Sequence, residues 1–119
     1  MIDLSGLTIL VVEDEPIVAM CLEDMLADLG CTVVGPAATV AEGLAEARGA
    51  VLDAAILDIN LGEATSYPIA SVLADRAVPI VFATGYARAD PPEAIRAELI
   101  GKPYSREDIV AALGRALAG

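Results

Sequence analysis

The stretch LTILVVEDEPIVAMCLEDMLADLG, from Leu7 to Gly30, decides the fold. It opens with Leu7–Val12, an apolar run of strand length, and continues through three acidic residues to Pro16, which suits the first turn of a helix. From Pro16 onward, apolar residues recur every three or four positions until Gly30, which predicts one amphipathic helix. A buried strand followed directly by a helix is the unit from which parallel sheets are built.

The same alternation continues along the rest of the chain. Further strands are expected at Cys31–Val34, Asp53–Leu57, Val78–Ala83 and Leu99–Ile100, and further helices at Val40–Arg48, Tyr67–Arg76 and from Ser105 to Leu117. Pro91 and Pro92 cannot lie inside a helix, so a short fourth helix is expected from about Glu93. The pattern predicts an α/β fold, a flavodoxin-like doubly wound parallel sheet of five strands in the order 2-1-3-4-5, with five helices.

Composition limits the possible functions. The 119 residues fit one domain, residues 1–119, with no output domain. With 18 acidic and 7 basic residues, a formal charge of −11 and no Lys/Arg run, direct binding to nucleic acid or to a membrane is not expected. No stretch suits a membrane span or a secretory signal. The cysteines, Cys21 and Cys31, are expected to be small buried hydrophobic residues in a reducing cytoplasm.

Residues that can bind a cation and a phosphoryl group follow four of the expected strands. They are Glu13 and Asp14, then Asp58, Thr84 and Lys102. In a doubly wound sheet, ligands bind in a crevice at the carboxyl ends of the strands. Carboxylates gathered there repel one another unless a cation joins them, and Mg²⁺ prefers carboxylate oxygens. Asp58 can act as a nucleophile, while Lys102 and Thr84 can contact the phosphoryl oxygens.

In these features the chain resembles the receiver domains of two-component response regulators. The likeness runs from about Leu7 to Leu117 and rests on the motifs Val-Val-Glu13-Asp14-Glu15, Ile-Leu-Asp58-Ile-Asn60-Leu, Phe82-Ala83-Thr84-Gly85-Tyr86 and Lys102-Pro103. The resemblance implies that a sensor histidine kinase phosphorylates Asp58. It also implies that Glu13, Asp14 and Asp58 hold Mg²⁺ together with the backbone carbonyl of Asn60. The bond before Pro103 would be cis.

Three stretches are similar to a narrower subgroup of mostly stand-alone alphaproteobacterial receivers, often associated with kinases of the HWE type: Asp58-Ile-Asn-Leu-Gly, Ser66-Tyr67-Pro68-Ile69-Ala70 and Phe82-Ala83-Thr84-Gly85-Tyr86. Most receivers carry Tyr or Phe three residues before the lysine, as a ring that turns inward on activation. Leu99 occupies that position here, so Tyr86 or Tyr104 would have to replace the ring. The expected switch and partner surface comprises Gly85, Tyr86, Leu99, Pro103 and Tyr104.

Other functions fit the residues less well. A phosphatase of the haloacid dehalogenase type needs a second Asp where Asn60 stands, so no enzyme is expected beyond promotion of its own phosphorylation and dephosphorylation. A flavin carrier needs a phosphate-binding loop where Glu13 and Asp14 would repel the phosphate. A receiver-like protein-binding module that works without phosphorylation is the alternative. In either case the signal would pass to an unknown downstream protein.

Overall fold

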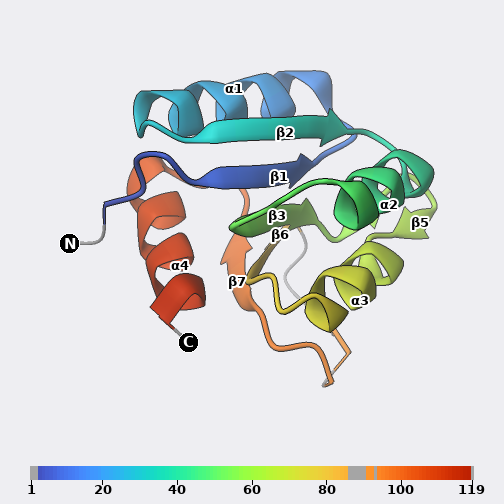
Figure 1. The fold of residues 1–119 in the computed structure, drawn as a ribbon. Helices are drawn as coiled ribbons and strands as arrows, with labels where there is room; N and C mark the ends of the chain where they lie inside the picture. The colour runs from blue at the N-terminus through green and yellow to red at the C-terminus, as the bar shows by residue number, and fades with distance from the viewer. Residues whose placement is uncertain (1–2, 86–90, 93, 119) are drawn as a thin grey trace.

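The computed structural model describes residues 3–85, 91–92 and 94–118, which form a parallel sheet with helices on both faces (Figure 1). The strands of this sheet are β1 (Thr8–Val12), β2 (Thr32–Ala37), β3 (Ala54–Asp58), β6 (Ile80–Thr84) and β7 (Glu98–Gly101). The helices are α1 (Pro16–Asp28), α2 (Val40–Gly49), α3 (Tyr67–Asp75) and α4 (Arg106–Ala118). The predicted α/β class with a five-stranded parallel sheet is therefore confirmed.

The strand order is β2-β1-β3-β6-β7. This numbering differs from the predicted order 2-1-3-4-5, because the segment expected to be a loop contains two short strands, β4 (Asn60–Leu61) and β5 (Ala64–Thr65). They pair with each other as a separate antiparallel hairpin and do not join the large sheet. Within the large sheet, β3 lies between β1 and β6, so the carboxyl ends of these three strands are neighbours.

The described residues contain four helices, whereas five were predicted. The additional helix was expected from about Glu93, which lies outside the described residues, and residues 91–92 and 94–97 are not helical. Pro91 and Pro92 have no backbone N–H group and a fixed φ, which opposes helix formation through this segment. Edge strand β7 follows, and its Leu99 is 46% exposed.

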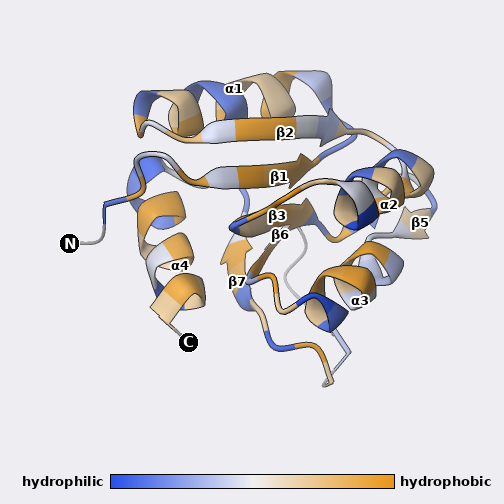
Figure 2. Cartoon of the chain, in the orientation of Figure 1, coloured by the Kyte–Doolittle hydropathy of each residue, from blue (hydrophilic) through white to orange (hydrophobic). Residues whose placement is uncertain are grey.

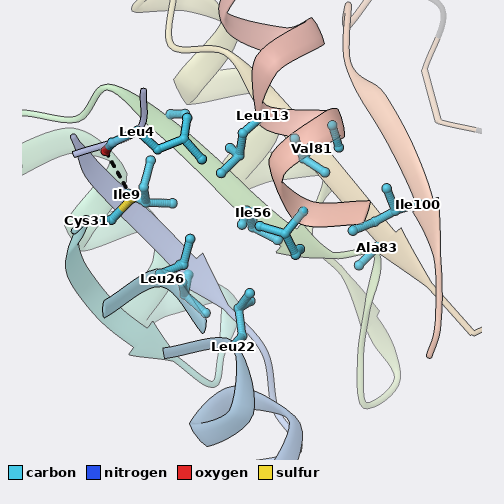
Figure 3. Close-up of a cluster of buried hydrophobic side chains, with 14 residues drawn as sticks. Leu4, Ile9, Leu22, Leu26, Cys31, Ile56, Val81, Ala83, Ile100 and Leu113 are labelled. Atoms are coloured by element: carbon cyan, nitrogen blue, oxygen red, sulfur yellow. Dashed lines mark hydrogen bonds between the residues drawn. The ribbon is translucent and has the colours of Figure 1, made fainter. Parts of the chain in front are cut away.

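Alternating side chains of the strands build two apolar layers. Along β1, Ile9 and Val11 enter the layer beneath α1 and α4, whereas Leu10 and Val12 enter the layer beneath α2 and α3. In Figure 2 strand β1 is mostly orange, whereas the helices mix hydrophilic and hydrophobic residues. Figure 3 shows the first layer, in which Cys31 is buried and its thiol donates a hydrogen bond of 3.3 Å to the Leu4 carbonyl. No helix within the described ranges is both long and apolar enough to cross a membrane.

Helices α2 and α3 pack closely against each other. Gly43 of α2 is buried and faces Ile69 of α3, which is fully buried. A Cβ atom at position 43 would overlap with the end of the Ile69 side chain. The contact therefore depends on the absence of a side chain at Gly43, even though glycine is a poor helix former.

Helix α3 ends at a left-handed residue that is not glycine. Ala77 has φ 58°, and its N–H donates to the Ala74 carbonyl at 3.0 Å. The Val78 N–H donates to the Leu73 carbonyl at 2.9 Å, which completes a Schellman motif. An L-residue in this conformation carries a steric cost of about 1–2 kcal/mol that glycine avoids.

The substitution Ala77→Gly is therefore expected to raise the free energy of unfolding by about 0.5–1 kcal/mol, because relief of the steric cost exceeds the added entropy of the unfolded chain. Its matched control is Ala74→Gly, at an exposed position inside the same helix, which should lower the free energy of unfolding by about 1 kcal/mol. Urea unfolding measures both changes. Changes of the same sign at the two positions would contradict this account.

Candidate functional site

The predicted site residues meet at the carboxyl edge of the sheet. Glu13 and Asp14 lie between β1 and α1, Asp58 ends β3, Thr84 ends β6 and Lys102 follows β7. The strands end level with one another, since the residues paired at this edge are Val12 with Leu57, Asp58 with Ala83, and Thr84 with Gly101. The order of the strands thus brings together side chains that are far apart in the sequence.

Four carboxylates surround the resulting crevice. Glu13, Asp14, Glu15 and Asp58 each place one carboxylate oxygen within 4.8 Å of the others. Glu13 and Asp58 are buried, Asp14 is half-buried and Glu15 is exposed. A cavity of about 300 Å³ opens beside them, and its lining also includes Asn60, Gly62, Gly85 and Lys102.

Lys102 reaches into this acidic group from the far strand. Its Nζ lies 2.7 Å from Glu13 Oε1, 3.0 Å from Asp58 Oδ2 and 3.6 Å from Glu15 Oε1. Its backbone N–H donates to the Thr84 carbonyl at 2.8 Å, which extends the β6–β7 pairing beyond the strand. The following bond, Lys102–Pro103, is cis as predicted.

The charges of the crevice shift the pKa values of its members. Burial, followed by the hydrogen bond and charge of the neighbouring Asp58, raises the pKa of Glu13 from an ordinary value of 4.5 to about 8, although Lys102 opposes the shift. Burial by itself lowers the pKa of Lys102, but its hydrogen bonds to Glu13 and Asp58 raise it above the ordinary range. The ammonium group therefore stays charged at neutral pH.

The donors at this site are of the kind that Mg²⁺ prefers. All four are hard carboxylate oxygens, and they lie close enough for one ion to contact several of them. Glu13 Oε2 is buried and has no hydrogen-bond partner among the described residues. A buried acceptor without a partner is costly, and a divalent cation would satisfy it. The residues present therefore fit a divalent cation.

Two residues of the site were not singled out in the sequence. Glu15 contributes to the acidic group, and the Gly62 N–H donates a hydrogen bond of 3.0 Å to Asp14 Oδ2. Glu15 could have been found from its place directly after the acidic pair. Gly62 is the last residue of the quoted stretch Asp58-Ile-Asn-Leu-Gly, but its contact with Asp14 was not predicted, because it depends on a hairpin where a loop was expected.

The expected switch surface is only partly assembled. Tyr104 packs on the α1 and α4 side of the sheet, and burial raises its pKa to about 12, with Glu13 contributing. Leu99 points to the opposite face, because its neighbour Ile100 belongs to the α1 and α4 layer. The structure therefore does not bring Tyr104 to the position of Leu99. Gly85 and Pro103 are exposed, and Tyr86 lies outside the described residues.

The raised pKa of Glu13 predicts a pH-dependent stability in the absence of divalent ions. Between about pH 5 and 8 the folded protein retains a proton on Glu13 that the unfolded chain has lost. The free energy of unfolding should therefore fall as pH rises through this range, by at most about 1.4 kcal/mol for each pH unit. Urea unfolding in EDTA at several pH values measures the slope.

Glu13→Gln should remove most of that slope, because glutamine does not titrate. Asp24→Asn, at an exposed position on α1, is the control and should leave the slope unchanged. An excess of Mg²⁺ should also flatten the slope, since a cation favours the ionised carboxylate. A slope that persists in Glu13→Gln would contradict the assignment to this residue.

A doubly wound sheet that carries an acidic crevice and a partly buried lysine at its carboxyl edge is typical of the receiver class of α/β proteins. The sequence matches the family described as Response regulator receiver domain over residues 9–114. The chain therefore belongs to this family, and it is a receiver domain of two-component signalling.

Comparison with individual proteins places the chain near two related regulators. It is 43% identical to SdrG from Sphingomonas melonis, whose solution structure superposes with a TM-score of 0.83 and full coverage of both chains. It is 34% identical to the phyllosphere-induced regulator PhyR of Methylorubrum extorquens over 92% of this chain and 43% of PhyR. The chain thus spans less than half the length of that relative.

The structure of a third similar protein contains a metal ion. The receiver domain of the sensor histidine kinase PA1611 from Pseudomonas aeruginosa is 26% identical and superposes with a TM-score of 0.83, over 97% of this chain and 100% of that one. Its crystal structure has a magnesium ion coordinated in the active-site cleft.

Proposed function

We propose that this receiver accepts a phosphoryl group from a sensor histidine kinase on Asp58, with Mg²⁺ bound beside it. The observation that carries the proposal is the contact of Lys102 Nζ with both Asp58 and Glu13 inside the acidic crevice. One ammonium group there partly offsets the charge of several carboxylates. An incoming phosphoryl group would therefore lie close to both the Asp58 nucleophile and the Lys102 ammonium group.

The chemistry assigns a separate task to each residue. One Asp58 oxygen attacks the phosphorus of a phosphohistidine, so that an O–P bond forms while the N–P bond breaks and the imidazole leaves with its electron pair. Mg²⁺, when bound, supplies charge neutralisation for the phosphoryl oxygens. Glu13, Asp14, Asp58 and the Asn60 carbonyl would hold the ion. Lys102 and the Thr84 hydroxyl would contact the phosphoryl oxygens.

Similar proteins support two details of the proposal, the identity of the ion and the group of receivers to which the chain belongs. Magnesium in the similar PA1611 receiver supports the same ion here. The likeness to SdrG over both chains supports membership of the same group of receivers. The three stretches described above favour a kinase of the HWE type. On this proposal the protein works in the cytoplasm, performs no metabolic turnover and passes its signal to a separate downstream protein.

Acetyl phosphate tests the proposal without knowledge of the kinase. Incubation of the protein with acetyl phosphate and Mg²⁺ should add one phosphoryl group per chain, detected by intact-protein mass spectrometry, and EDTA should prevent the addition. NMR spectra with beryllofluoride and Mg²⁺ should show shifts around Asp58. A wild-type protein that binds neither phosphoryl group nor beryllofluoride would refute the proposed function.

A further inference from the structure

The hairpin formed by β4 and β5 lies against the acidic crevice. Its base carries the pairing of Asn60 with Thr65, and the Asn60 N–H donates to Asp58 Oδ1 at 3.3 Å. Between its strands, the Gly62 N–H donates to Asp14 Oδ2 at 3.0 Å. The hairpin therefore contacts two of the four carboxylates through backbone donors.

The hydrogen bond from Gly62 fixes the orientation of Asp14. Asp14 is only half-buried, so water would otherwise allow its side chain to change rotamer. With Oδ2 held by the backbone, the carboxylate is retained in the acidic group, where one of its oxygens lies within 4.8 Å of carboxylate oxygens of Glu13, Glu15 and Asp58. The entropic cost of ordering this ligand is thus met on folding and not on ion binding.

The left-handed backbone conformation at Gly62 directs its N–H group toward Asp14. Its φ is +64°, and a Cβ atom there would meet nothing within 4 Å. Glycine is therefore not required for space at this position. It is favoured because it adopts, without steric cost, the left-handed turn that directs the N–H toward Asp14.

We propose that Gly62 is a positioning residue, whose backbone N–H holds Asp14 in place as a ligand of the divalent cation. The inference rests on the proposed function, in which Asp14 binds Mg²⁺. It adds that the affinity for the ion is set partly by a residue that does not touch the ion. The hairpin is then part of the metal site and not merely a connection between β3 and α3.

Two substitutions at the same position test the proposal. Gly62→Asn keeps the N–H group and tolerates a left-handed backbone, whereas Gly62→Pro removes the N–H group and cannot adopt a positive φ. The dissociation constant for Mg²⁺ is measured by calorimetry and that for Mn²⁺ by electron paramagnetic resonance. We expect Gly62→Asn to stay within about twofold of the wild type, and Gly62→Pro to bind at least about tenfold more weakly.

A variant that lacks the Asp14 carboxylate separates loss of positioning from general damage to the fold. In Asp14→Ala, the further change Gly62→Pro should leave the Mn²⁺ dissociation constant unchanged, because the side chain that Gly62 positions is absent. Circular dichroism in EDTA shows whether each variant is folded. Should Gly62→Pro not fold, in vitro translation with glycolic acid at position 62 replaces only the N–H group with oxygen, and the same weakening is expected.

The outcomes distinguish the two proposals. A folded Gly62→Pro or ester variant with wild-type affinity for Mg²⁺ would overturn the positioning role alone. A further loss of affinity in the Asp14→Ala background would also overturn it, because Gly62 would then act through another group. A wild-type protein without Mg²⁺ binding would refute the proposed function and this inference together.

Discussion

Asp58→Asn is expected to abolish phosphorylation by acetyl phosphate in the presence of Mg²⁺. An amide oxygen is a much weaker nucleophile than a carboxylate oxygen, so the phosphoryl group has no acceptor at the crevice. Mass spectrometry should therefore show one phosphoryl group on the wild-type chain and none on the variant.

Asp75→Asn provides the matched control. Asp75 lies exposed on α3, at its last residue and outside the crevice, so this variant should be phosphorylated like the wild type. Labelling of Asp58→Asn at the wild-type level would remove Asp58 as the acceptor. If Asp58→Asn also retained full partner binding and signalling, the phosphorylation-independent binding module would become the better description.

Lys102→Met should have the largest effect on stability. Lys102 is 16% exposed and pairs with the Glu13 and Asp58 side chains, which are 3% and 6% exposed. Removal of the ammonium group leaves the buried Asp58 carboxylate without its cation. It also removes the hydrogen-bond donor to Glu13, which keeps its proton up to about pH 8. The free energy of unfolding is therefore expected to fall by about 2–4 kcal/mol at neutral pH. Addition of Mg²⁺ should restore part of the loss, because the ion can pair with the same carboxylates.

Arg106→Met is the control for loss of a positive charge. Its guanidinium lies 2.6 Å from Asp28, but both side chains are at least half exposed, at 50% and 60%. Solvent screens such a pair, so a change below about 1 kcal/mol is expected. Urea unfolding of both variants, with EDTA and with Mg²⁺, measures the difference. Equal losses in the two variants would show that burial does not strengthen the contacts of Lys102.

Much of the fold was predictable because it depends on local periodicity. The apolar run Leu7–Val12 and the helical spacing after Pro16 predicted strand β1 and helix α1, which the structure contains. The spacing did not predict the buried face of α1 correctly, because Ile17 is 77% exposed and Cys21, which was expected to be buried, is also exposed. The crevice was predictable for a related reason. Once parallel strands alternate with helices, the residues directly after them must share one edge, so Asp58 and Lys102 could be brought together without coordinates.

The errors lie where the structure depends on short or non-local contacts. Hairpin β4–β5 has two residues in each strand, too few for an alternating pattern to appear in the sequence. Its stability depends in part on the contact of Gly62 with Asp14, 48 positions away. The expected helix near Glu93 had no strong apolar stripe to support it, and the neighbouring described residues are not helical.

The close contact of Gly43 with Ile69 has a mechanical consequence. The side chain of Ile69 occupies the space that a side chain at Gly43 would need. Sliding of one helix along the other is therefore expected to be opposed, because it would disturb this close packing. Helices α2 and α3 should then move together as one rigid unit. If a change at Asp58 displaces α2, α3 is therefore expected to move with it.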